Sequence, residues 1–121
     1  MRTMTFVRAG LAPNFYFGRD AVLLAMDNAG INPFLGALIQ AQQQESARLN
    51  LDGMSHQFVI EPGAADVEFH DGEAVWRLDH AKAAEIIELL TDMSQHPGAG
   101  HYYVDISAPA KTLVISLDEY V

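Results

Sequence analysis

The chain has no cysteine among its 121 residues. Disulfides and thiolate metal sites are therefore excluded, and the composition is that expected of a cytoplasmic protein. An uninterrupted apolar run of about 18 residues is also missing, so we expect no membrane-spanning helix. Met1-Arg2-Thr3-Met4 supplies a basic residue but no apolar stretch after it, which argues against a signal peptide.

Basic residues are scarce in the second half. Residues 61–121 carry twelve acids against Arg77, Lys82 and Lys111, whereas residues 1–60 carry four acids and four bases. The whole net charge of −9 therefore lies in the second half. This distribution disfavours nucleic-acid binding, because phosphate contacts need a basic surface. It favours a basic protein partner, with a merely solubilising surface as the alternative.

Catalytic signatures are missing as well. No serine lies in a Gly-x-Ser-x-Gly motif, and Gly98-Ala99-Gly100 precedes a predicted strand rather than following one, unlike a nucleotide-binding loop. Histidines at metal-ligand spacing are absent. We therefore predict no enzymatic activity, catalytic residue, cofactor or metal site. The alternative is a hydrolase in which His101 and Asp105, on one face of a strand, act with His70.

Asp71-Gly72 is the strongest structural signal, because this dipeptide is typical of a two-residue hairpin turn of type I′. Folding about it pairs Asp66 with Arg77 across the strands, where opposite charges attract. Strict alternation then gathers the apolar residues of the hairpin on one face. These residues are Val67, Phe69, Ala74, Trp76 and Leu78.

Further elements follow from periodicity and capping. Asp79 is a good N-cap for a helix over 80–94 with an apolar stripe, and 56–60, 101–106 and 112–117 read as strands. A turn over 50–55 is centred on Asp52-Gly53.

Earlier in the chain we expect a strand over 4–8, a loop over 9–17 and a helix over 21–28 that ends at Gly30. A second helix over 33–49 begins at Asn32-Pro33. Gly36 weakens this helix, and a close helix contact would explain it.

These elements predict a single α+β domain over 1–121, with an antiparallel sheet of four to five strands and helices packed on one face. If all strands join one sheet, its uncovered face shows acids and a tyrosine. The partner-binding residues predicted on this face are Asp66, Glu68, Glu73, Tyr103 and Asp105. The aromatic run 15–17 is either a lid over the core edge or part of an interface.

The runs GAADVEFHDGEAVWRLDHAKAAEIIELL and GHYYVDISAPAKTLVISLDEYV resemble small acidic bacterial proteins of unassigned function, associated with toxin–immunity gene neighbourhoods. The resemblance covers about residues 56–121 and carries no functional residue with it. It implies a non-enzymatic immunity-type inhibitor that binds a basic protein toxin. The other interpretation is a homodimeric structural or regulatory domain, paired through an edge strand or through the helix over 33–49.

Overall fold

The computed structural model describes residues 6–96 and 98–119 and contains eight strands and two helices. In chain order the elements are β1 (Val7–Tyr16), β2 (Arg19–Met26), α1 (Asn28–Gln44), β3 (Ser46–Leu51), β4 (Met54–Ile60), β5 (Ala65–His70), β6 (Glu73–Leu78), α2 (His80–Gln95), β7 (Gly100–Asp105) and β8 (Thr112–Leu117).

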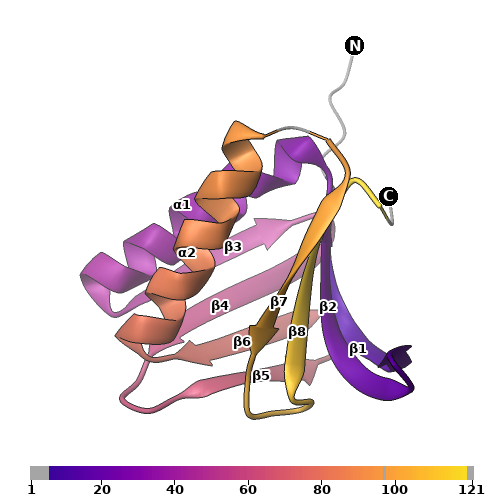
Figure 1. Cartoon of the computed structure of the whole chain (residues 1–121). Helices are drawn as coiled ribbons and strands as arrows, with labels where there is room; N and C mark the ends of the chain where they lie inside the picture. Colours follow the sequence, from indigo (N-terminus) through magenta and orange to yellow (C-terminus); the bar gives the residue numbers. More distant parts are fainter. Residues whose placement is uncertain (1–5, 97, 120–121) are drawn as a thin grey trace.

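The fold is α+β, with two four-stranded sheets (Figure 1). The first sheet has the order β1-β2-β8-β7, and the second has the order β3-β4-β6-β5. Both sheets are mixed, because β2 pairs with β8 in parallel and β4 pairs with β6 in parallel. The prediction of one antiparallel sheet is therefore wrong. Alternation along a strand reveals which side chains share a face, but it does not reveal which strand lies next to it.

Both helices pack on the same face of the second sheet, α1 against β3 and β4 and α2 against β6 (Figure 1). A hydrophobic cluster joins both helices to both sheets, with Leu24, Phe34, Trp76 and Leu90 almost fully buried in it. Backbone hydrogen bonds also tie the sheets together. Ser107 N–H donates to the Ala65 carbonyl, and the loop after β7 thereby caps the edge of β5.

The central hairpin has the predicted register, from Asp66 opposite Arg77 to His70 opposite Glu73. Val67 and Trp76 are buried on its inner face as expected. The turn type differs, because Gly72 has a positive φ of 70° and Asp71 does not. A type I′ turn needs positive φ at both positions. The predicted helix over 80–94 is also confirmed as α2, which Asp79 caps by accepting a hydrogen bond from Lys82 N–H at 2.7 Å.

The first part of the chain contradicts the sequence prediction. The expected loop over 9–17 is most of β1, and the expected helix over 21–28 is β2. Residues 21, 22 and 24–26 are buried, on both sides of the strand. A strand covered on both faces reads as a continuous apolar run, which periodicity cannot distinguish from a short buried helix. Of the strand predicted over 4–8, Met4 and Thr5 lie outside the described residues.

Helix α1 begins five residues earlier than predicted. Asp27 is its N-cap and accepts from Gly30 N–H at 2.8 Å, so Gly30 belongs to the first turn and does not end a helix. Pro33 lies inside the helix rather than at its start. The helix ends before Glu45, whose φ of 72° breaks it, and the remaining predicted helical residues form β3.

Candidate interaction surface

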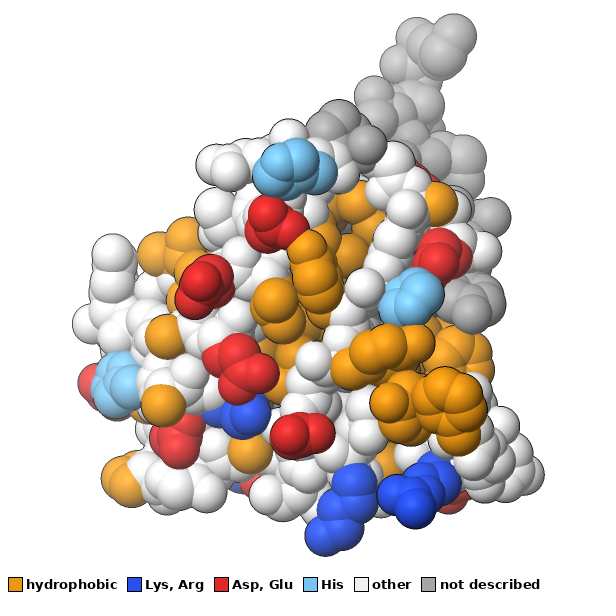
Figure 2. All heavy atoms as spheres, in the orientation of Figure 1, with side chains coloured by type: hydrophobic (Ala, Val, Ile, Leu, Met, Phe, Trp, Pro, Cys, Tyr) orange, Lys and Arg blue, Asp and Glu red, His pale blue; other side chains and the backbone are white. Residues whose placement is uncertain are grey.

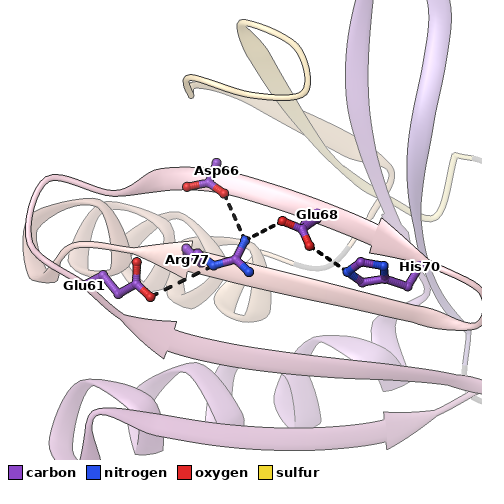
Figure 3. A network of polar contacts seen from close by, with 5 residues as sticks. All are labelled: Glu61, Asp66, Glu68, His70 and Arg77. Atoms are coloured by element: carbon purple, nitrogen blue, oxygen red, sulfur yellow. Dashed lines mark hydrogen bonds and ion pairs between the residues drawn. The ribbon is translucent and has the colours of Figure 1, made fainter.

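The second sheet has one face without helices, which we call the open face. Figure 3 views the sheet from this side, with the helices behind it. Because side chains alternate along a strand, the residues that flank buried Val67 and Trp76 point to the open face. The charged and histidine side chains on it are Arg48, Asp66, Glu68, His70, Glu73 and Arg77.

Arg77 lies at the centre of a polar network on the open face (Figure 3). Its guanidinium donates to Glu68 at 2.9 Å and to Asp66 at 3.4 Å. Glu61, at the end of β4, lies 4.0 Å from the same guanidinium. Glu68 also contacts His70 Nε2 at 2.7 Å. Three carboxylates thus surround one cation, which leaves two negative charges when His70 is neutral.

The network perturbs the titration of its members. The Arg77 hydrogen bond, followed by that of His70, holds the pKa of Glu68 below its ordinary value of 4.5. Reciprocally, the Glu68 hydrogen bond raises the pKa of Arg77. The side chains of Glu61 and Glu68 are 48% and 47% exposed, so both carboxylates remain accessible from solvent.

Glu73 lies on the same face, at the far end of β6 from Arg77. Its carboxylate is 3.9 Å from Arg48 on β3, and Arg48 also donates to Gln57 at 3.4 Å. This carboxylate is therefore balanced by a positive charge of its own. The excess negative charge of the open face is concentrated around Arg77.

Tyr103 and Asp105 lie elsewhere, on β7 of the first sheet. The structure therefore brings Asp66, Glu68 and Glu73 together on one face but separates Tyr103 and Asp105 from them. The cause is the division of the strands into two sheets. Tyr103 packs its ring against Tyr16 at 4.8 Å between centroids and against His101 at 5.1 Å.

The histidines do not form the predicted hydrolase arrangement. His101 contacts Glu119 through Nδ1 at 3.1 Å, whereas His70 lies on the other sheet. Ser116 also donates to Glu119, at 2.6 Å, and with His101 it lowers the pKa of this carboxyl group. The carboxylate thus lies between the hydroxyl and the imidazole, whereas nucleophile activation needs the imidazole in the middle. Among residues 6–96 and 98–119, no group of three His, Asp or Glu side chains is arranged to hold a metal ion.

Sequence reasoning found the Asp66–Arg77 pair but missed Glu61, which reads only as the end of a strand. Ile60 pairs with Leu78 where β4 and β6 run in parallel. Because of this pairing, Glu61, the next residue along, lies beside Arg77. A parallel neighbour is not specified by any local turn, so the sequence offered no signal for it.

No family model matches the chain, and no curated protein matches it. A solved structure, that of Drosophila Suppressor of Fused, is similar in fold with a TM-score of 0.56 and 8% sequence identity. The match covers 98% of this chain and spans 28% of that protein's chain. At this identity the likeness concerns the fold alone. Neither of the two described helices is long and apolar enough to cross a membrane.

Proposed function

We propose that this chain is an acidic, non-enzymatic binding protein whose open face docks a basic protein. The observation that supports this proposal is the grouping of Glu61, Asp66 and Glu68 around the single cation Arg77. The excess negative charge is accessible, and it lies on a face that neither helix covers. An arginine or lysine from a partner would complete the charge balance of this cluster.

Arg77 holds the carboxylates of this cluster in position before a partner binds. By bonding Asp66 and Glu68 across the two strands, it fixes carboxylates that would otherwise lose rotamer freedom on binding. A regular sheet also holds them more firmly than a loop would. We expect binding that is fast at low ionic strength and weakens as salt is added, because exposed charges are screened.

The most concrete form of this function is an immunity-type inhibitor of a basic toxin. The net charge of −9 and the resemblance of residues 56–121 to small acidic bacterial proteins favour this form. A toxin that acts on nucleic acid carries a cationic groove, since it must bind phosphates. The open face would occupy that groove and exclude the toxin's substrate. Under this proposal the protein acts in the cytoplasm, where such a toxin would act.

The proposal is tested by capture from a lysate of the source organism with three immobilised proteins. These are the wild type, an Asp66→Asn/Glu68→Gln variant and a Glu85→Gln/Glu88→Gln variant. Both variants remove two exposed or half-exposed negative charges, but the second pair lies on α2, away from the open face. We expect a basic protein to be retained by the wild type and by the α2 variant, and lost with the open-face variant. Retention of no basic protein by the wild type would refute the proposal.

A further inference from the structure

The first sheet carries an apolar feature that the proposed function does not use. Of the four large hydrophobic side chains exposed among the described residues, three belong to this sheet or its β1–β2 turn, namely Leu11, Phe17 and Tyr103. Leu11 pairs with buried Val22 and so points to the other face from Tyr103, which leaves Phe17 and Tyr103 as the pair of interest. Figure 2 shows apolar side chains gathered over β7 and the tip of the β1–β2 hairpin, at the lower right of the view. Exposed aromatic side chains that lie close together are typical of an interaction site.

Phe17 is the most exposed of these residues, at 88%, and its backbone is strained. Phe17 and Gly18 form the β1–β2 turn with φ values of 49° and 78°. Asp52 and Gly53 form the β3–β4 turn with nearly the same pair, 53° and 74°. Aspartate and asparagine tolerate this left-handed region far better than phenylalanine does. The chain therefore keeps an exposed aromatic ring where a polar residue would suit both the backbone and the solvent.

One aromatic contact positions the Phe17 ring. Tyr16 packs on Phe17 edge to face at 4.8 Å, and on Tyr103 of β7 at the same centroid distance. The Phe17 ring therefore packs on Tyr16, which in turn packs on Tyr103, and the rest of the Phe17 ring projects into solvent. A supported aromatic side chain loses little conformational entropy on binding, which is the property of an interface anchor.

A pocket of about 330 Å³ lies on the same sheet, lined mainly by apolar groups of β1 and β2. Gly10, Leu23 and Ala25 contribute to its lining, with Phe6 and Arg8 beside them. The strand register places Gly10, Leu23 and Val114 in one row with Tyr103, so pocket and aromatic support share the outer face of the first sheet. The volume exceeds that of a phenyl ring, and Arg8 already lies over one ring, that of Phe6, at 5.0 Å.

Gly10 is the informative residue of this pocket. Its backbone is extended strand without positive φ, so the chain does not need glycine for its conformation. A Cβ added there would meet no atom within 4 Å, so internal packing does not need glycine either. Glycine inside a strand lowers stability and often marks a close approach by another molecule. Its effect here is to keep the pocket open.

We propose that this face is a self-association surface, in which Phe17 of each copy enters the pocket over Gly10 of the other. A two-fold axis makes the two contacts equivalent and closes the assembly as a dimer. A second copy of the chain is the occupant that fits, because each copy carries both an exposed aromatic side chain, Phe17, and an apolar pocket beside Gly10 on the same face. This inference is independent of the proposed function, which uses the other sheet.

The test is the mass of the full chain by sedimentation equilibrium, from about 5 µM to about 1 mM. We expect the wild type to pass from monomer to dimer, and Phe17→Asn and Gly10→Val each to weaken the dimer at least about tenfold. Both substitutions suit the local backbone, so the melting temperature should be unchanged or higher. Ile39→Asn, which removes an exposed apolar side chain from α1, is the control and should dimerise like the wild type.

Mixing the variants sharpens the result. Phe17→Asn retains the pocket and Gly10→Val retains the anchor, so an equal mixture should associate more strongly than either variant alone. A wild type that stays monomeric throughout, or variants that dimerise like it, would overturn the proposal. A monomeric wild type that binds the probe anilinonaphthalene sulfonate, with binding lost in Gly10→Val, would assign the pocket to another ligand and overturn it equally.

Discussion

Trp76 donates a hydrogen bond from Nε1 to Nδ1 of His56 at 3.2 Å, and the two side chains are 1% and 0% exposed. The bond fixes the imidazole tautomer, because an Nδ1 that accepts leaves the proton on Nε2. Within the described residues Nε2 has no hydrogen-bond partner. Burial lowers the pKa of His56 from 6.5 to about 4, so the residue is neutral near pH 7.

Acid should therefore destabilise the fold through His56. Above its ordinary pKa of 6.5 both folded and unfolded chains are neutral there, whereas between 6.5 and about 4 only the unfolded chain takes up the proton. The free energy of unfolding should fall by roughly 3 kcal/mol across that range on account of this residue. Urea unfolding followed by Trp76 fluorescence measures it. In His56→Gln the loss between pH 7 and 4 should shrink by that amount, and an unchanged loss would exclude His56 as its source.

A side chain at Gly30 should destabilise the fold for a steric reason. A Cβ at this position would lie 2.6 Å from the Phe6 carbonyl oxygen and 2.6 Å from a methyl group of Val7. We expect Gly30→Ala to lower the free energy of unfolding by roughly 1–3 kcal/mol. Gly36→Ala, in the same helix, is the control. The space beside Gly36 is open, which rules out the close helix contact expected there, and alanine should stabilise by roughly 0.5–1 kcal/mol.

Arg77 should control the titration of Glu68. In Arg77→Met the pKa of Glu68 should rise toward 4.5, because its principal hydrogen-bond donor is gone. The stabilising effect of this pair is present above pH 4.5 and is lost as the pH falls through the lowered pKa of Glu68. Carbon-detected NMR titration of the glutamate carboxyl groups measures the change. Arg48→Met, which removes the partner of Glu73, should leave Glu68 unaffected; equal shifts in both variants would point to net charge rather than to this contact.

The Asp79 cap should stabilise α2 through its hydrogen bond from Lys82 N–H. Asp79→Ala should reduce the free energy of unfolding by about 1 kcal/mol, because a helix-terminal N–H loses its acceptor. Asp79→Asn retains a capping oxygen and should fall within about 0.3 kcal/mol of the wild type. Chemical denaturation compares the three proteins. An Asn variant as unstable as the Ala variant would mean that the charge, and not the cap, matters.

What could be read from the sequence was local. The β5–β6 hairpin and α2 were predicted because each is specified by neighbouring residues, a turn dipeptide in one case and a cap with an apolar stripe in the other. β2 was missed because its burial depends on β8, which lies at the opposite end of the chain. Asp27 is not predicted as the cap of α1, because Asn32-Pro33 matches the usual pattern of a helix start more closely.

On the open face, too, the contacts within one hairpin could be predicted from the sequence, whereas the contacts between hairpins could not. Asp66 and Arg77 could be placed opposite each other because one hairpin contains both. The contact of Glu61 with Arg77 and that of Glu73 with Arg48 depend on how hairpins assemble into a sheet. The sequence predicts Tyr103 and Asp105 on the same face only if all strands join a single sheet. Two sheets place them beside Tyr16 and Phe17, where a different interaction is proposed.

The most direct test of the open face as a docking site is the affinity of the captured basic partner at about 50 mM and about 300 mM salt. The wild type, Asp66→Asn/Glu68→Gln and Glu85→Gln/Glu88→Gln are compared. Binding by the open face predicts at least a tenfold loss of affinity and a smaller salt dependence in the first variant, with little change in the second. Equal effects of the two variants would show that only the overall charge is recognised, and would contradict the account.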